Sequence, residues 1–452
     1  MTLDFPKTLA GDPHVPIGDP RFGPIAPGER RAVIAATMGT MIEWFDYALY
    51  GAAASLVLNQ LFFPQFSAAG GVLAAFATFA VGFVSRPIGG LVIGHFGDRH
   101  GRKPALVLTI LLMAVSTVAM GLLPTYEQIG IAAPVLLVVL RLLQGFGAGA
   151  EYAGAVTFVV ETVPVHRRAY YTAFLQAATI VGIMLATLCF LVVSTLSEAA
   201  LLSWGWRLPF LGSALLFGVA LHIRKRLDET PEYVAVMAQA AARRQERRIP
   251  VGALLRESPK QVLFGFLSIT GHNANVYILS AFSLSYMTNT LGMSRTDALS
   301  AVVVAALVGV ILTPLVGALA DRMGHGVVYG AGALFTLALA FPIFWLMETR
   351  NVFLATLGLG LGFGFGFSGL ASAQGAFLAD LFPPHTRFSG IAMTRELNSI
   401  LIAGPTPFIA AALVSAADGS PAYVAVYLMA CCAVTLFAVL AIRAERPYAR
   451  HD

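Results

Sequence analysis

Long apolar stretches recur along the whole of this 452-residue chain, and they constrain its fold more than any other feature. Each is about twenty residues or longer, enough for a helix to cross the roughly 30 Å hydrocarbon core of a bilayer. Backbone polar groups find no water in that core, so the chain has to satisfy them internally. The alternating pattern of membrane β-strands is absent from these stretches. The sequence therefore predicts an all-α membrane protein.

Twelve membrane-spanning helices are predicted from these stretches. Only 12% of the residues are charged, against about one quarter in soluble domains, which agrees with a chain that lies mostly in lipid. The predicted spans are residues 32–59, 70–94, 105–123, 131–160, 169–196, 206–223, 260–289, 298–319, 327–347, 352–378, 389–415 and 422–442.

Basic residues gather in the tails and in the even-numbered loops, whereas the odd-numbered loops hold only Arg295 and Arg350. By the positive-inside rule, both termini then lie in the cytoplasm, and we expect a multi-pass protein of a bacterial-type inner membrane. The net charge of +5 reflects this topology, so we expect lipid and no nucleic acid as a partner.

The chain divides into two similar halves. The motif at residues 94–101 and the motif at residues 161–168 both recur about 220 residues later, which indicates a duplicated six-helix unit. We predict two pseudo-symmetric six-helix bundles. The predicted parts are a flexible cytoplasmic tail (1–29), the N-terminal bundle (30–223), a basic cytoplasmic linker (224–258), the C-terminal bundle (259–443) and a second cytoplasmic tail (444–452).

A tight loop, GHFGDRHGRKP at residues 94–104, joins the second and third spans. Asp98 is expected near a positive helix N-terminus, and Arg102 can reach an acid such as Glu161. The GxxxDRxGRK pattern resembles the signature loop of the major facilitator superfamily. The second copy has His325 and Gly326 in place of the Arg-Lys pair, so we expect a weaker contact there. The predicted gating latch comprises Gly94, Asp98, Arg99, Arg102, Glu161, Arg168, Asp321, Arg322, Asp380 and Arg387.

The fourth span contains RLLQGFGAGAE at residues 141–151, which is similar to the RxxQGxGxG segment of proton-coupled members of that superfamily. Its small residues predict close packing against a neighbouring helix. Arg141 lies near the bilayer midplane, where a charge costs about 2.5 to 3.5 kcal/mol on insertion scales, so it needs a partner or a function.

Two acids on the first span, Glu43 and Asp46, lie on one helix face, too deep to reach the membrane surface. We predict Asp46 as the partner of Arg141, with Glu43 as the alternative. The pairing either locks two helices together or marks a proton path, and we favour the proton path. The predicted proton-coupling residues are Asp46, Glu43 and Glu151.

Segments IEWFD (42–46), SRPIGG (85–90), GWRLPF (205–210) and DETPEY (228–233) together resemble the metabolite:proton symporter family of the major facilitators. The resemblance covers residues 32–442. It implies the twelve-helix fold and transport of citrate, 2-oxoglutarate, dicarboxylates, aromatic acids, proline or betaine. The sequence RELN at 395–398 departs from the Tyr and Asn that the family often has there, so no single member's substrate carries over.

Further polar residues inside the spans are candidates for substrate binding, although each can instead form an interhelical hydrogen bond. They are Arg141, Gln144, Tyr47, Tyr50, Gln176, His272, Asn273, Asn275, Tyr277, Arg395 and Asn398. For Arg86, which precedes a proline, we expect a structural role. The GxGxxG at residues 364–369 follows no strand and predicts close packing rather than a dinucleotide site.

We therefore expect a monomeric, proton-coupled symporter that imports a small organic acid by alternating access. Arg141 and Arg395 favour a carboxylate substrate. The expected coupling ion is the proton, with no metal and no cofactor. The open alternatives are an importer of a zwitterion such as proline or betaine, an efflux antiporter on the same fold, and a receptor without flux. The sequence contains neither a phosphate-binding loop nor a nucleophile elbow, which disfavours an ATP-driven pump and an enzyme.

Overall fold

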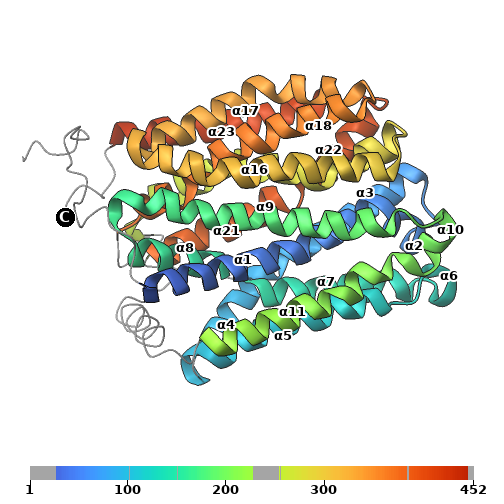
Figure 1. Cartoon of the computed structure of the whole chain (residues 1–452), viewed down its shortest axis with the longest axis horizontal. Coiled ribbons are helices and arrows are strands. Elements are labelled where there is room, and N and C mark those ends of the chain that lie inside the picture. The colour runs from blue at the N-terminus through green and yellow to red at the C-terminus, as the bar shows by residue number, and fades with distance from the viewer. Residues whose placement is uncertain are drawn as a thin grey trace, which may run out of the picture.

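The computed structural model describes residues 27–100, 102–149, 151–227, 254, 256–383 and 386–445, and almost all of these are helical. The helices run side by side along the long axis of the molecule (Figure 1). The first 26 residues, residues 228–253 of the predicted linker, and residues 446–452 lie outside the described residues.

Six helical rods form the first half. Each rod holds one predicted span, and several are interrupted by a turn of π-helix or by a short break. The rods are α1 (Pro27–Ala53) with η2 (Ala54–Leu58) and α2 (Asn59–Phe62), α3 (Ala68–Val84) with α4 (Arg86–His100), α5 (Arg102–Leu122), α7 (Ala132–Ala148) with α8 (Glu151–Thr162), α9 (Arg168–Val193), and α11 (Arg207–Leu227). The connections contain α6 (Tyr126–Ile129), η3 (Val165–Arg167), α10 (Glu198–Ala200) and η4 (Leu201–Gly205).

The second half repeats this arrangement. Its rods are α14 (Pro259–Tyr277) with η5 (Ile278–Phe282), α15 (Ser283–Ser285) and η6 (Tyr286–Thr290), α16 (Arg295–Met323), α17 (His325–Glu348), α18 (Val352–Leu361) with η7 (Gly362–Phe367), α19 (Ser368–Ser372) and α20 (Gln374–Leu381), α21 (Arg387–Asn398) with η8 (Ser399–Ala403) and α22 (Thr406–Ala416), and α23 (Ala422–Glu445).

All twelve predicted spans thus have a helical counterpart, which confirms the predicted fold class. Nine helices of the described residues are long and apolar enough to cross a membrane, or ten if the bent pair before and within α11 is one span. Residues Val107–Leu122 of α5 form a shorter apolar helix. The first rod is not among the nine, and its interior carries the acids Glu43 and Asp46, which lower its mean hydropathy.

The distribution of apolar and polar side chains fits a lipid environment. Leu91, Leu215 and Phe353 are more than two thirds exposed, whereas Glu43, Asp46 and further ionisable side chains are buried in the interior. This inverted pattern is what a bilayer favours, because lipid tails solvate apolar surface and exclude charge.

Glycines bring helices into backbone contact at two crossings that the sequence indicated. A Cβ added to Gly145 of α7 would lie 1.8 Å from the carbonyl oxygen of Gly82 in α3, and one added to Gly369 of α19 would lie 2.5 Å from Cα of Gly332 in α17. No side chain fits either space. The predicted close packing of the fourth span and of the glycine-rich tenth span is confirmed.

The two halves meet mainly along α9, which packs against both α1 and α16 (Figure 1). Helix α8 packs against α21, and α3 packs against α22. Helix α1 begins and α23 ends at the same end of the bundle, which we call the terminus end; the other is the opposite end.

Candidate functional site

Helix α1 places four functional candidates on one face. Glu43, Asp46, Tyr47 and Tyr50 have the i, i+3, i+4, i+7 spacing that aligns side chains along one side of a helix. All four are at most 2% exposed. Helix α1 therefore presents two carboxyl groups and two phenol rings to the interior.

A chain of hydrogen bonds joins Asp46 to Arg141. Thr117 of α5 donates its hydroxyl to Oδ1 of Asp46, and Gln144 donates from Nε2 to Oγ1 of Thr117 over 3.0 Å. Oε1 of Gln144 accepts from the Arg141 guanidinium. The predicted direct pair of Arg141 with Asp46 is therefore wrong, because Thr117 and Gln144 lie between the two charges.

Arg141 is held by neutral groups. Its Nη2 donates to the backbone oxygen of Phe79 over 2.8 Å, and its guanidinium lies 4.1 Å from the ring centroid of Tyr50. Within the described part of the chain it forms no ion pair, and its buried Nε has no hydrogen-bond partner. Aromatic faces attract a desolvated cation and take over part of the role predicted for an acid.

Arg86 of α4 bridges two acids from different halves. Its Nη2 lies 2.9 Å from Oε1 of Glu43, and its Nε lies 3.2 Å from Oε2 of Glu396 in α21. The alternative prediction, Glu43 as the partner of Arg141, is therefore wrong as well. We call Glu43, Arg86 and Glu396 the inter-half triad. A structural role was expected for Arg86, but neither of these two partners was predicted.

Arg395 lies next to Glu396 but points to a different neighbour. Its guanidinium lies 3.4 Å from the ring centroid of Tyr152 in α8, and no acid of the described residues forms an ion pair with it. Its buried Nε lacks a hydrogen-bond partner among those residues. Arg395 is only 5% exposed, so it is a buried cation at the interface of the halves that forms no ion pair with an acid of the described residues.

Unpaired polar atoms gather on α14 in the same interior. Both ring nitrogens of His272 and both amide atoms of Asn275 are buried without a hydrogen-bond partner within the described chain. His272 interacts electrostatically with Arg395 and packs against the ring of Phe367. Such groups are costly to bury unpaired, and a polar ligand would satisfy them.

Two other predicted binding residues are engaged with each other. Nδ2 of Asn273 donates to Oδ1 of Asn398 over 2.7 Å, and Nδ2 of Asn398 donates to the backbone oxygen of Phe266 over 2.9 Å. Gln176 of α9 donates to Oε1 of Gln374 in α20 over 3.0 Å, which joins the halves. These three candidates act first as interhelical contacts in this conformation.

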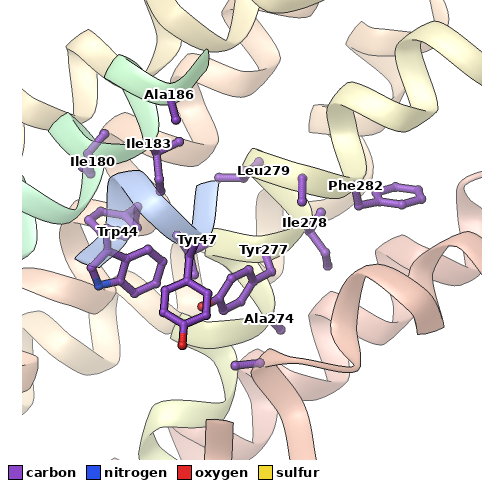
Figure 2. Close-up of a cluster of buried hydrophobic side chains, with 14 of the residues drawn as sticks. Trp44, Tyr47, Ile180, Ile183, Ala186, Ala274, Tyr277, Ile278, Leu279 and Phe282 are labelled. Atoms are coloured by element: carbon purple, nitrogen blue, oxygen red, sulfur yellow. The ribbon is translucent and has the colours of Figure 1, made fainter. Parts of the chain in front are cut away.

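Aromatic rings from both halves surround these charges. Tyr277 stacks on Trp44 with ring centroids 5.7 Å apart, and it meets Phe79 and Phe83 edge-on, also at 5.7 Å. Figure 2 shows Trp44 and Tyr47 of α1 beside Tyr277. The hydroxyl of Tyr47 and Nε1 of Trp44 are buried without a hydrogen-bond partner in the described residues. The interior thus offers flat apolar surface with polar edges.

The third predicted proton-coupling acid, Glu151, lies against α1. A Cβ added to Gly39 would lie 2.6 Å from Oε1 of Glu151. Glu151 is half-buried and interacts electrostatically with Glu43. It therefore lies closer to the inter-half triad than to Asp46 along the face of α1.

At the terminus end, Asp321 caps a helix of the other half. Its two carboxylate oxygens accept from the backbone nitrogens of Ala169 and Tyr170 in α9, each over 2.9 Å. The negative charge meets the positive end of that helix, which is the placement that the sequence predicted for the signature aspartate. It is seen here for the second copy; the side chains of the first-copy residues Gly94, Asp98, Arg99 and Arg102 lie outside the described part.

Four other latch residues form two ion pairs across the halves. Glu161 lies 4.0 Å from Arg387, and Arg168 lies 3.9 Å from Asp380. His325, which stands where the first copy has a basic pair, lies 2.7 Å from Asp380 and 3.4 Å from Asp321. Arg322, by contrast, is exposed.

The opposite end is joined as well. Oγ of Ser55 donates to the backbone oxygen of Ala281 over 2.9 Å, and Nδ2 of Asn289 donates to the backbone oxygen of Ser55 over 2.9 Å. Arg295 pairs with Glu198 over 2.9 Å. A cavity of about 310 Å³ lies beside this ion pair, lined by Leu56, Gln60, Glu198, Thr288, Asn289, Met293, Ser294 and Arg295. Polar contacts therefore cross between the halves at both ends.

Known proteins resemble this chain in sequence and in fold over nearly its whole length. A family model described as Major Facilitator Superfamily matches residues 36–394 and 262–452. The shikimate transporter of Escherichia coli (strain K12) is 37% identical over 415 residues, which is 92% of this chain and 94% of that protein. The proline/betaine transporter of the same strain is 33% identical over 431 residues, 92% and 84% of the two chains. A partially occluded inward-open structure of the xylose transporter XylE from E. coli superposes with a TM-score of 0.70 at 17% identity, covering 94% of this chain and all of that one.

Proposed function

The chain belongs to the major facilitator superfamily, a family of membrane transporters rather than enzymes, and from this premise we propose that it imports a small organic acid together with protons. In this proposal the two halves rock about a site between them, which opens to one side of the membrane at a time. The terminus end faces the cytoplasm, because the loops there carry most of the basic residues.

The observation that carries the proposal is the unpaired cation of Arg395. It is buried, it has no acidic partner among the described residues, and unpaired polar atoms of His272 lie in its electrostatic reach. A guanidinium binds a carboxylate through two parallel hydrogen bonds. A substrate carboxylate would therefore neutralise Arg395, and the aromatic rings of Trp44 and Tyr277 would hold the carbon skeleton.

The proposed proton site is Asp46, at the end of the hydrogen-bonded chain to Arg141. A proton on this carboxyl group removes the negative charge of the oxygen that accepts from Thr117, so the hydrogen bond from Thr117 weakens. The Gln144 side chain is then held less firmly. The change reaches Arg141 without a direct contact. In this way protonation on α1 alters the packing of α7, which is the kind of coupling that a symporter needs.

The test is uptake by proteoliposomes across a panel of carboxylates, betaines and amino acids, with and without an inward proton gradient. We expect a carboxylate to accumulate only with the gradient. Arg395→Gln should raise the solute concentration for half-maximal uptake about 10- to 150-fold, which corresponds to the loss of one charged hydrogen bond. Arg395→Lys should raise this concentration less. Arg350→Gln, in an exposed turn, is the matched control. Unchanged uptake by Arg395→Gln would refute this role.

A second candidate substrate class is a zwitterion such as proline or betaine. The rings of Trp44, Tyr47 and Tyr277 offer faces that attract a quaternary ammonium group, and two relatives in the comparison differ in this respect, one named for shikimate and one for proline/betaine. The same panel decides between them. Gradient-driven uptake of betaine without any carboxylate uptake would favour the zwitterion.

An efflux antiporter on the same fold would share these contacts and differ in direction. Counterflow with an imposed inward proton gradient separates the two cases. An importer accumulates solute inside the vesicle, whereas an antiporter expels preloaded solute as protons enter.

A further inference from the structure

The inter-half triad holds two carboxylates on one guanidinium. Glu43 and Glu396 both contact Arg86, and the exposed fractions of Glu43, Arg86 and Glu396 are 1%, 3% and 9%. With both carboxyl groups ionised, one positive charge cannot neutralise two negative ones, so the triad would carry a net negative charge in a place that water barely reaches.

The two contacts differ in what they join. Glu43 and Arg86 belong to the same half, so their ion pair moves as one unit. Glu396 belongs to α21 of the other half and lies at the longer distances of 3.2 and 3.5 Å from Arg86. Rocking of the halves must lengthen the Arg86–Glu396 contact while it leaves the Arg86–Glu43 pair intact.

From this geometry we infer that Glu396 carries a proton during transport, taking it up when the halves part and releasing it when Arg86 returns. The inference rests on the proposed proton-coupled function. Once Arg86 withdraws, the Glu396 carboxylate has lost the cation that neutralised it, and it binds one proton as O–H from the water that enters on the open side, which removes its charge. When Arg86 returns, the guanidinium re-forms its hydrogen bonds to the carboxylate, and the same proton leaves to the water on the side that is then open, which is the cytoplasm in the proposed function.

Other charged and titratable groups face this site and shape its field. Arg395 lies one residue away on α21 without an acidic partner in the described chain, so it is a cation that a bound carboxylate would neutralise. An anionic substrate bound to Arg395 would thus cancel the positive charge next to Glu396 and favour protonation of Glu396. Binding of the solute and binding of the proton are coupled in this way. The groups on the elements around Glu396 are Glu43 and Tyr47 on α1, Arg86 on α4, Glu151 and Tyr152 on α8, and His272 and Tyr277 on α14.

The experiment compares Glu396→Gln with the wild type in proteoliposomes, using the solute that the uptake panel identifies. Two readouts are taken: counterflow without a gradient and accumulation driven by an inward proton gradient. We expect counterflow within about twofold of the wild type and accumulation reduced at least about tenfold. Glu348→Gln, an exposed acid at the end of α17, is the matched control and should leave both readouts unchanged.

Two results would overturn the inference: full accumulation by Glu396→Gln, or loss of both readouts in a variant whose melting temperature is unchanged. If the variant does not fold, carbodiimide labelling of the wild type replaces it, because this reagent modifies protonated carboxyl groups in apolar surroundings. Labelling of Glu396 that falls as pH rises supports the inference, and no labelling at any pH overturns it. A wild type that accumulates no solute on a gradient refutes the proposed function instead, so the two failures are distinct.

Discussion

Replacing Thr117 by Val tests the hydrogen-bonded chain between Asp46 and Arg141. Valine has nearly the shape of threonine but neither donates to Asp46 nor accepts from Gln144, so both bonds of the buried hydroxyl are lost. Interhelical hydrogen bonds in membrane proteins average about 0.6 and reach about 1.7 kcal/mol. Two of them, one charged, make the expected loss of unfolding free energy about 1 to 3 kcal/mol.

The assay combines a detergent unfolding titration with gradient-driven uptake. We expect Thr117→Val to accumulate solute about tenfold less than the wild type, because a loss of about 1.4 kcal/mol in the coupling between Asp46 and Arg141 corresponds to a factor of ten. Thr117→Ser keeps the hydroxyl and should stay within about twofold. Thr187→Val removes a buried hydroxyl that bonds only within its own helix and serves as the packing control. If Thr117→Val accumulates solute like Thr117→Ser, the chain plays no part in coupling.

Three further outcomes follow from single contacts. Arg86→Gln leaves two buried carboxylates without their cation and should lower the unfolding free energy by about 3 to 5 kcal/mol in a denaturation titration; a loss below about 1 kcal/mol would contradict the triad. Gly145→Leu should abolish the monodisperse peak in size-exclusion chromatography, because no Cβ fits against Gly82, whereas Gly218→Ala, with open space around it, should behave as the wild type. Asp321→Asn removes the charge at the start of α9 and should lower the free energy of opening the terminus end by about 0.3 to 2 kcal/mol. Cysteines introduced at that end should then react faster with a thiol reagent, and slower labelling would contradict the role of Asp321 as a helix cap.

The fold was predictable because lipid leaves few options. Runs of about twenty apolar residues must form helices, and the repeat of one loop motif at Gly94 and Gly317 reveals the duplication. The interruptions were not predictable. Turns of π-helix such as η7 in the tenth rod arise from tertiary packing of small residues, and the local composition does not distinguish them from ordinary α-helix.

The candidate site was predictable in content but not in pairing. Charges deep in apolar spans marked Glu43, Asp46 and Arg141, because burial of a charge demands a function. Which charges meet depends on which helices become neighbours and on neutral side chains between them, and one sequence does not specify this. Thr117 gave only a weak signal, a hydroxyl within an apolar span.

Arg86 illustrates the error most clearly. The predicted second span ended at residue 94, which placed Arg86 within about ten residues of its cytoplasmic end. Helix α4 instead continues for 15 residues from Arg86 to His100, so the guanidinium lies deeper and reaches Glu396 of the other half. Glu396, the acid beside Arg395, was visible in the sequence. Its partner Arg86 lies on a helix about 310 residues earlier in the chain, so the sequence did not indicate the pair.

Joint inward movement of solute and protons can be measured as a change in lumenal pH. Vesicles that carry the protein and a trapped pH dye receive the solute outside, with no gradient imposed. We expect the lumen to acidify with the wild type, and to keep its pH with Asp46→Asn and in protein-free vesicles. Solute entry without any pH change, or with the lumen turning alkaline, would contradict joint inward movement.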